Sequence, residues 1–256
     1  MPGWGTQWMG FLLDEGVDRR EAARALATFA FRELGRLHIE ITDPRLTAAK
    51  MDGAGYVAEA GTTYRSDLTQ SEASLQARVQ GNYRRSAAQA LRQGLTTEVA
   101  TNEEFAKEYH AQLVEVFARK GLNPPYGPER VRQLIRALNR TEELLLLRVR
   151  SPTGESLATS LTVGMKGRTA VLWGTASTTD KAGYHPNQLL LWETIRQSQA
   201  RGHVAFDMGG AGSYKAKYGG TLVETAHFHR TRYPLMRHGR SLMRRLVLLG
   251  RKIRPA

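Results

Sequence analysis

The chain has 256 residues, of which 41% are hydrophobic and 24% charged, as in an ordinary soluble globular protein. It contains no cysteine, which excludes disulfides, thiolate zinc sites and a cysteine nucleophile. Its net charge of +13 favours anionic partners, such as nucleic acid, phospholipid or a phosphorylated substrate. The sequence shows neither a secretory signal nor an apolar run near the ~20 residues of a membrane span, so we expect a cytoplasmic protein.

The N-terminal part of the chain alternates between helical and strand-like patterns. Gly81-Asn82 interrupts a long helical pattern, and Gly94 is suited to end it, because glycine adopts left-handed backbone angles freely. Thr101-Asn102-Glu103-Glu104 fits a capping box, whose side chains bind the first amides of a helix. The elements predicted here are helices over 19–34 and 71–93 and strands over 37–41, 56–58 and 63–68, the last two joined by a turn near Gly61.

The remainder of the chain predicts a strand meander between helices. A proline at 186 is tolerated in the first turn of a helix, and glycine-containing turns separate the meander strands. The predicted elements are helices over 101–121, 130–139, 186–199 and 235–253, strands over 144–149, 157–163, 169–175, 204–207 and 222–233, and a short lysine-bearing helical turn near residue 215.

Three sequence blocks in the last third of the chain fall in order around this helix and the strand after it. They are Pro186-Asn187…Leu190…Trp192, Phe206-Asp207-x-Gly209-Gly210 and Tyr214-Lys215-x-x-Tyr218-Gly219-Gly220. A further block, Asn82-Tyr83-Arg84-Arg85, precedes Ala90 and Gly94 on a predicted helix. Loops of special backbone geometry at the ends of adjacent elements are where α/β proteins bind ligands.

These blocks, and the element order from residue 101 onward, resemble the Fem-type (peptidoglycan bridge-forming) aminoacyltransferases and their relatives in the GNAT acetyltransferase superfamily. The resemblance covers about residues 60–235. It implies an α/β fold with a mixed sheet: an abbreviated N-terminal GNAT-like lobe over 1–98 and a complete GNAT-like acyltransferase domain over 99–234. A basic amphipathic helix over 235–256 completes the expected organisation.

Lys215 and Asp207 are the expected catalytic residues. A lysine ammonium after a Gly-Gly turn can neutralise a carbonyl oxygen or phosphate as charge develops, and the resemblance implies that role for Lys215. Asp207 ends a buried strand, where its carboxylate can accept a proton from an amine or hydrogen-bond the turn. The residues expected to bind substrate are Tyr184, His185, Asn187, Trp192, Trp173, Arg84, Arg85, Tyr126 and Tyr218.

No metal site is predicted. His227 and His229 are two residues apart on a predicted strand and share a face, but no third ligand is near them in the sequence.

The donor is expected to be aminoacyl-tRNA, with no tightly bound cofactor. Acyl-CoA-using GNAT enzymes cradle the pyrophosphate with a glycine-rich loop, whereas residues 177–185 here contain one glycine, Gly183. The expected reaction is therefore aminoacyl transfer to an amine of a cell-envelope precursor or small acceptor. The alternatives are an acyl-CoA-dependent N-acetyltransferase acting on an amino sugar or similar amine, and a non-catalytic GNAT-like module that binds anions.

The C-terminal segment carries much of the excess charge. Residues 225–256 contain nine Lys or Arg residues and no Asp or Glu. We expect residues 235–256 to form a helix that either packs on the domain or a twin subunit, with its arginines on tRNA phosphates, or lies on the inner face of an anionic membrane.

Overall fold

The structure, a computed structural model, describes residues 10–138, 141–178 and 182–233. These residues form two compact units. The smaller unit contains the described residues up to Thr62 together with those from Glu224 onward, and the larger unit spans Thr63–Val223. Within the described residues, no helix is both long and apolar enough to cross a membrane. The helix predicted over 235–253 lies outside them.

The smaller unit consists of α1 (Arg19–Arg32), β1 (His38–Ile41), the short 3₁₀ helix η1 (Ala49–Met51) and parts of two long strands, β2 (Val57–Asp67) and β8 (Thr221–Thr231). Helix α1 begins at Arg19 because the Asp18 carboxylate accepts the Glu21 N–H at 2.9 Å. Strand β1 pairs antiparallel with β8, and the core between α1 and the strands is built from small and apolar residues: Ala23, Ala27, Ala30, Phe31, Ile41 and Phe228.

The larger unit is built on a mixed sheet, as predicted. Its strand order is β2-β7-β6-β5-β4-β3, and every pairing except that of β6 with β7 is antiparallel. The strands not yet given bounds are β3 (Thr96–Ala100), β4 (Leu144–Arg150), β5 (Ser156–Val163), β6 (Thr169–Ser177) and β7 (Ala205–Asp207). Residue 98, the expected lobe boundary, therefore lies inside this sheet.

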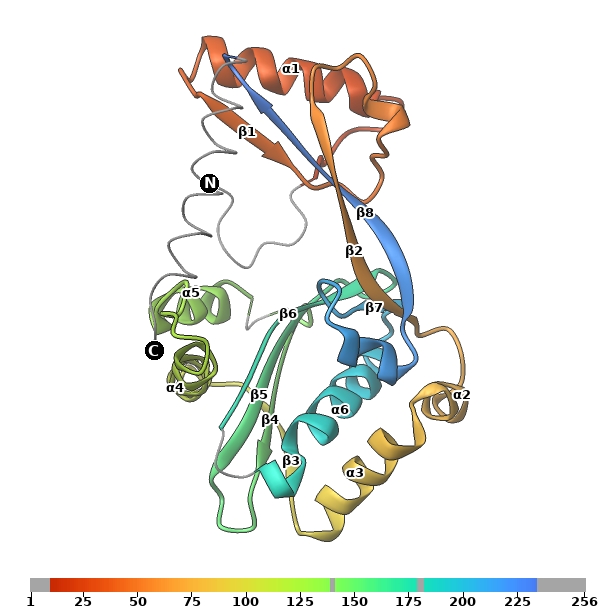
Figure 1. Cartoon of the computed structure of the whole chain (residues 1–256), viewed down its shortest axis with the longest axis vertical. Coiled ribbons are helices and arrows are strands. Elements are labelled where there is room, and N and C mark those ends of the chain that lie inside the picture. The colour runs from red at the N-terminus through yellow and green to blue at the C-terminus, as the bar shows by residue number, and fades with distance from the viewer. Residues whose placement is uncertain (1–9, 139–140, 179–181, 234–256) are drawn as a thin grey trace. The chain divides into compact units, whose positions relative to one another are not determined.

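Helices cover both faces of this sheet (Figure 1). One face carries α3 (Gly81–Arg92) and α6 (Pro186–Ala200), which lie side by side, with the short α2 (Glu72–Arg78) leading into α3. The other face carries α4 (Glu104–Ala118) and α5 (Pro128–Leu138). Leucines of β4 alternate between the two cores, Leu144 and Leu146 facing α4 and Leu147 facing α6.

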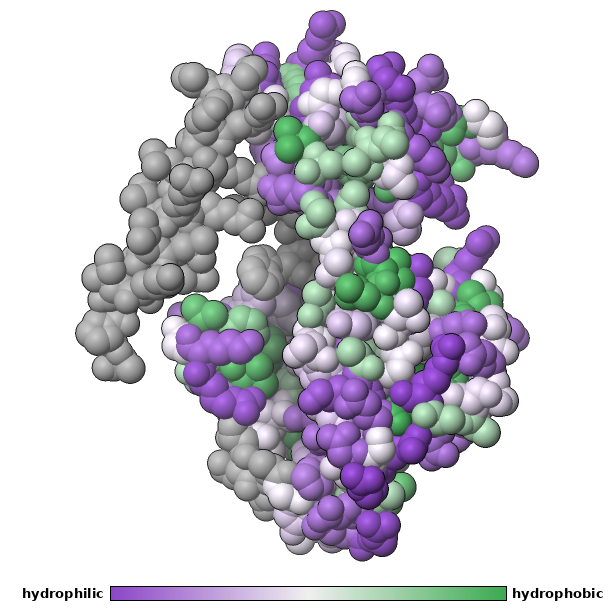
Figure 2. All heavy atoms as spheres, turned by 45° about the vertical axis from the view of Figure 1, so that its right-hand side comes forward, coloured by the Kyte–Doolittle hydropathy of each residue, from purple (hydrophilic) through white to green (hydrophobic). Residues whose placement is uncertain are grey.

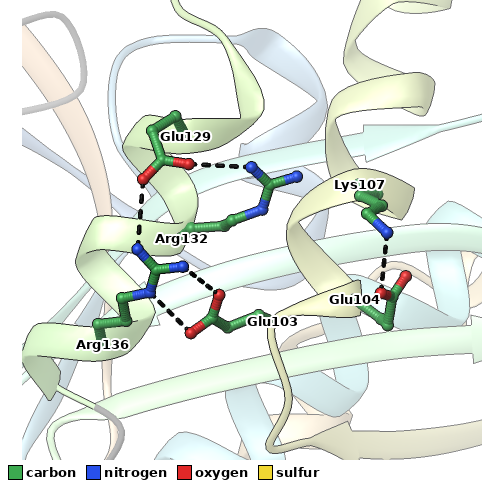
Figure 3. Close-up of polar contacts among 6 residues, drawn as sticks. All are labelled: Glu103, Glu104, Lys107, Glu129, Arg132 and Arg136. Carbon is green, nitrogen blue, oxygen red and sulfur yellow. Dashed lines mark hydrogen bonds and ion pairs between the residues drawn. The ribbon is translucent and has the colours of Figure 1, made fainter.

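Ion pairs fasten α5 to the start of α4 (Figure 3). Arg136 of α5 donates two hydrogen bonds of 2.8 Å to the Glu103 carboxylate just before α4. Glu129 contacts both Arg132 and Arg136, while Glu104 pairs with Lys107 along α4. The predicted capping box needs Thr101 at the N-cap, but Glu103 occupies that position, and its side chain makes no capping hydrogen bond.

One strand prediction was wrong. Residues 56–58 and 63–68 were expected as two strands with a turn at Gly61, but β2 runs unbroken through that position. The glycine permits a close approach of a neighbouring side chain, because a Cβ at Gly61 would lie 2.8 Å from the Thr225 hydroxyl oxygen. Strand β3 was not predicted, since Thr96–Ala100 shows no clear hydrophobic alternation.

Strand β6 diverges from β7 soon after they meet. The two strands pair only over Thr169–Val171 and Ala205–Asp207, and β6 then continues to Ser177. On its other side, Gly174 pairs with Leu161 of β5 and Leu172 with Thr162, so Trp173 is an extra, bulged residue. A bulge bends a strand and increases its local twist. The C-terminal half of β6 is thereby left without a strand on its β7 side.

Candidate active site

A cleft of about 330 Å³ opens in the larger unit beside this free half of β6. Its walls come from the end of β6, the first turns of α6, the end of α4, one residue of α3 and the 3₁₀ helix η3 (Ser213–Tyr218). The residues that line it are Tyr83, Val116, Arg119, Thr175, Ala176, Ser177, Asn187, Gln188, Leu190, Leu191, Tyr214 and Tyr218. Two of the expected substrate-binding residues, Asn187 and Tyr218, are among them.

The cleft presents hydrogen-bonding groups and one permanent charge. Three tyrosines, two amide side chains and the hydroxyls of Thr175 and Ser177 line it together with the Arg119 guanidinium. None of the lining residues that the structure describes is a carboxylate or an imidazole. The ring of Tyr83 meets that of Tyr218 edge to face, with centroids 5.2 Å apart, a favourable geometry for aromatic pairs.

Asp207 organises the turn that follows β7. Its carboxylate is fully buried and accepts hydrogen bonds from the Thr63 hydroxyl, from the backbone N–H of Gly209 at 2.9 Å and from Arg65 at 3.3 Å. Three donors therefore occupy both carboxylate oxygens. These hydrogen bonds hold the carboxylate inside the turn, and Asp207 does not line the cleft. The structural role that the sequence left open for Asp207 is the one its contacts support.

Lys215 is buried next to the same turn. Only 8% of the residue is exposed, and its ammonium group donates to the carbonyl oxygen of Gly209. Burial lowers the pKa of Lys215, and the negative charge of Asp207 opposes that effect. The Nζ atom lies 5.8 Å from the ring centroid of Tyr214, which lines the cleft. Lys215 is not itself a lining residue, so its charge lies one side chain behind the cleft wall.

The N-terminus of α6 forms another side of the cleft. His185 precedes the helix with φ 56°, the single positive value among non-glycine residues that the structure describes. Pro186 has no N–H, and the amides of Gln188 and Leu189 donate to the His185 carbonyl at 3.2 and 3.4 Å. Asn187 donates from its side chain to the Ser177 hydroxyl at 2.9 Å, which ties the helix start to the end of β6.

Three other expected substrate-binding residues lie outside the cleft, around α3 and α6. Tyr184 packs against the core between α3, α6 and β4. Trp192 and Arg84 line a smaller groove of about 90 Å³ that shares Tyr83 and Tyr218 with the cleft. The Arg84 guanidinium donates to the carbonyls of Gln76 and Ala77 at 3.1 and 2.8 Å, so it binds the C-terminal end of α2.

Trp173 and Tyr126 lie together on the face of the sheet that α4 covers. Their ring centroids are 5.1 Å apart, and the Tyr126 hydroxyl is 2.9 Å from that of Tyr109. Burial raises the pKa of both tyrosines, which favours neutral hydroxyls that hydrogen-bond each other. These side chains pack around the bulge of β6 rather than lining the cleft.

Within the described residues, no group of three or more His, Cys, Asp or Glu side chains is placed to hold a metal ion. His227 and His229 belong to the smaller unit. The Nδ1 atom of His227 is 2.8 Å from the Thr42 hydroxyl, and its Nε2 is 3.7 Å from Glu40. The Nδ1 atom of His229 is 3.7 Å from a carboxylate oxygen of Glu59. Both imidazoles therefore belong to a polar face of the small sheet.

Sequence reasoning missed Arg119, Tyr83 and Tyr214 as residues of the cleft. Arg119 follows the last residue of α4, and a single arginine near a helix end carries no sequence signal for function. Tyr83 stands beside two arginines that were singled out for their charge, and Tyr214 beside Lys215. Each of these tyrosines is therefore next in sequence to a cationic residue that was already a candidate for the site, and this adjacency was the signal that could have identified them.

A model of the family described as "Acetyltransferase (GNAT) domain" matches residues 77–218. The match extends from the end of α2 through η3 and includes every residue that lines the cleft. It covers more than half of the chain. The protein belongs to the GNAT acetyltransferase domain family.

Solved structures agree with this GNAT assignment at the level of the fold. The chain is similar to FemX with a TM-score of 0.70 and 14% identity, over 87% of this chain and 79% of that one. It is also similar to L-PGS from Bacillus licheniformis (TM-score 0.57, 18% identity, covering 80% and 71%). A tandem GNAT protein from the clavulanic acid biosynthesis pathway gives a TM-score of 0.56 at 16% identity, covering 87% and 74%. Comparison with curated proteins gives no match.

Proposed function

We propose that this GNAT protein transfers an aminoacyl group from aminoacyl-tRNA to an amine of a cell-envelope precursor or a related small acceptor. The observation that carries the proposal is the pairing of a hydroxyl- and amide-rich cleft with a buried cation, Lys215, behind its wall. An ester donor needs positive charge where its carbonyl oxygen becomes negative. It does not need a strong base, because a neutral amine is itself a good nucleophile.

The reaction exchanges an ester for an amide. The acceptor nitrogen forms a bond to the carbonyl carbon of the aminoacyl ester, the bond from that carbon to the ribose oxygen breaks, and one amine proton is transferred to the leaving oxygen. Among the described residues, the cleft offers no carboxylate or imidazole to take this proton. The acceptor amine therefore enters in its neutral form, and the proton reaches the leaving oxygen through solvent or hydroxyl groups.

Lys215 supplies the electrostatic stabilisation in this proposal. Burial concentrates the effect of its charge, because the surrounding side chains screen it less than water does. The Gly209 carbonyl fixes the position of the ammonium group, and Asp207 fixes Gly209. A charge held in place before the reaction costs no reorganisation when the oxyanion forms.

The start of α6 supports a tRNA ester over acyl-CoA as the donor. A pyrophosphate cradle requires several free backbone amides at a helix N-terminus. Here Pro186 has no N–H, and the amides of Gln188 and Leu189 already donate to the His185 carbonyl. This arrangement leaves few amides for a pyrophosphate, and we propose that the protein uses no tightly bound cofactor.

Two of the structural neighbours support aminoacyl transfer. FemX shares the fold, and the sequence blocks resemble the Fem-type aminoacyltransferases. A C-terminal domain from Agrobacterium fabrum, described as belonging to a lysylphosphatidylglycerol synthetase, has a TM-score of 0.59 at 15% identity, over 84% of this chain and 74% of that one. The name of that protein describes a product with a lysyl group on a lipid.

An acyl-CoA-dependent N-acetyltransferase acting on an amino sugar or a similar amine is the second candidate. The observation that favours it is the family model, which describes an acetyltransferase domain and spans the whole cleft. The tandem GNAT protein from the clavulanic acid pathway shares the fold as well. In this second candidate function, the thioester of acyl-CoA would occupy the same cleft. The diphosphate of the CoA would then need hydrogen-bond donors other than the backbone amides of α6.

Direct binding of the two donors separates these candidates. The full chain is titrated with a mixture of aminoacyl-tRNAs, with uncharged tRNA and with acetyl-CoA, followed by transfer assays with radiolabelled donors and small primary amines. We expect tighter binding of the aminoacyl-tRNA mixture and transfer of label to an amine. Micromolar binding of acetyl-CoA, together with acetyl transfer and no aminoacyl transfer, would establish the second candidate instead.

The Lys215→Met variant serves as the control for catalysis, because it keeps the volume and removes the charge. If a folded Lys215→Met protein transfers the acyl group as fast as the wild type, the proposed role of Lys215 is wrong. If neither donor is transferred but both tRNA forms bind alike, the protein is the non-catalytic anion-binding module that the sequence left open.

A further inference from the structure

Two segments that contain no acidic residue meet on the surface beside the cleft. Residues 73–97 carry four arginines and no Asp or Glu, and residues 208–223 carry two lysines and no Asp or Glu. The first segment forms most of α2 and all of α3, and the second contains η3. Two stretches of chain far apart in sequence thus contribute positive charge only.

The structure joins these segments directly. The backbone N–H of Gln80, between α2 and α3, donates to the carbonyl of Lys217 at 2.8 Å. The Lys217 ammonium lies 5.1 Å from the ring centroid of Tyr83 on α3. Gly219 sits so close to Arg78 that an added Cβ would meet it at 2.5 Å. Helix α3 therefore packs against η3 through the side that carries Tyr83, which also lines the cleft, and the opposite side of α3 is exposed.

The arginines of this surface differ in how free they are. Arg84 is occupied by the carbonyls of Gln76 and Ala77 at the end of α2. Arg85 and Arg92 are exposed and lie seven positions apart, which places them on the same side of α3. That side is opposite Ala87 and Ala90, the residues that α3 buries.

We infer that the outward face of α3 bearing Arg85 and Arg92 is the docking surface for the phosphate backbone of the donor RNA. This inference rests on the proposed function and adds to it the part of the protein that holds the body of the tRNA. Arg85 and Arg92 are about 10 Å apart along the helix axis, so they can contact different phosphates of one strand. Guanidinium groups bind phosphate oxygens in a bidentate manner.

A membrane surface fits this face less well than RNA does. A helix that lies on a bilayer inserts large apolar side chains beside its basic residues. The outward face of α3 carries Asn82 and Gln89 between and beside its arginines, and these residues are polar and exposed. Figure 2 turns the α2–α3 side of the larger unit forward, where hydrophilic groups predominate.

The test compares a charge-removing double variant with a charge-keeping one. Arg85→Gln/Arg92→Gln removes both charges, and Arg85→Lys/Arg92→Lys retains them. Uncharged total tRNA is titrated against each full-length protein at several salt concentrations. We expect the Gln variant to bind at least tenfold more weakly at low salt, with a slope of log K against log salt reduced by about 1 for each phosphate that is no longer neutralised. The Lys variant should keep most of the wild-type slope.

A matched control is Arg168→Gln at the opposite end of β6 from the cleft, where the arginine is also exposed. It should leave tRNA binding unchanged. If the double Gln variant binds tRNA with the wild-type affinity and slope, the inference is wrong. If it loses binding to vesicles of anionic phospholipid instead, while its tRNA binding is intact, the surface is a membrane surface and not an RNA site.

A second donor separates this inference from the proposed function. An aminoacylated dinucleotide ending in adenosine offers the reactive ester with almost none of the phosphate backbone. We expect the double Gln variant to use it as well as the wild type does, while its KM for aminoacyl-tRNA rises. If the wild type uses neither donor, the proposed function fails, and the salt dependence of uncharged tRNA binding still decides whether α3 is an RNA surface.

Discussion

Asp207 and Lys215 bind opposite sides of the same residue, Gly209. The Asp207 carboxylate accepts the Gly209 N–H at 2.9 Å, and the Lys215 ammonium donates to the Gly209 carbonyl. The peptide groups of a single glycine, which has a φ of 69°, thus connect an anion to a cation. Asp207 is therefore a positioning residue in the proposed reaction: it holds the turn that holds the lysine.

Removing the Lys215 charge is expected to slow aminoacyl transfer by about tenfold in kcat, less than the roughly 10²–10³ that follows loss of a donor in direct contact with the oxyanion, because the ammonium lies behind Tyr214. Lys215→Met keeps the side-chain volume, and Lys215→Arg keeps the charge. Steady-state kinetics of both variants, with circular dichroism to confirm folding, measure the effect. If the charge of Lys215 is what matters, Lys215→Arg must lose less kcat than Lys215→Met does. A lysine with a purely structural role would give the opposite order, because its apolar surroundings accept Met better than Arg.

The rate should also fall at high pH, at a lower pH than an ordinary lysine would give. Burial lowers the pKa of Lys215 from its usual 10.5, and activity requires the protonated form, so activity is lost as the pH rises through the lowered pKa. In Lys215→Arg the loss should move upward, since a guanidinium stays charged above pH 12. A rate that stays flat to pH 10.5 in the wild type contradicts this assignment.

Truncating Asp207 is expected to destabilise the fold more than it alters substrate binding. Asp207→Ala leaves three donors without their acceptor in a fully buried place, which we expect to lower the free energy of unfolding by about 3 kcal/mol. Asp207→Asn keeps an oxygen for Gly209 and should cost less. Urea unfolding measures both. Equal stability of Asp207→Ala and the wild type would show that the turn does not depend on this carboxylate.

Arg119 is expected to bind an anionic group of the acceptor, because it is the one permanently charged side chain among the described residues that line the cleft. Arg119→Gln should raise the KM for the acceptor about tenfold and change kcat little. Lys120→Gln is the matched control, since this neighbouring exposed cation does not line the cleft. The same KM change in both variants would indicate a general charge effect instead.

Gly174 and Tyr109 should show strong coupling in a double-mutant cycle. A Cβ at Gly174 would overlap the Tyr109 hydroxyl, so Gly174→Ala is expected to destabilise the protein by about 2 kcal/mol. In a Tyr109→Phe background the overlapping oxygen is gone, and the cost of the alanine should fall to less than half. Additive effects in thermal or urea unfolding would mean that β6 can shift away from α4 freely.

Much of the element order followed from the sequence because the hydrophobic periods were clean. The leucine-rich run that forms β4 and the Pro186 start of α6 each predicted their element within a residue or two. The error at Gly61 has a specific cause: glycine signals both turns and close approach, and only the neighbouring Thr225 distinguishes the two. The capping-box prediction placed the helix start at Thr101, whereas the N-cap is Glu103, two residues later.

The candidate site was predictable only in part. The Gly209 turn and Lys215 stood in a block that could be read along the chain. The cleft itself depends on where β6 leaves β7 and on the bulge at Trp173, and both are properties of strand pairing that no local pattern encodes. Trp173 and Tyr126 were grouped with the site by residue type, whereas the direction in which each side chain leaves its strand or loop places them by α4.

The left-handed backbone of His185 has a consequence for engineering. A non-glycine residue in that conformation is disfavoured by about 1 kcal/mol, and glycine or asparagine would adopt it more readily. His185→Gly therefore offers a route to a more thermostable protein. The gain in the free energy of unfolding would measure the backbone strain at the start of α6. Any loss of activity in the same variant would measure what the His185 imidazole contributes to the reaction.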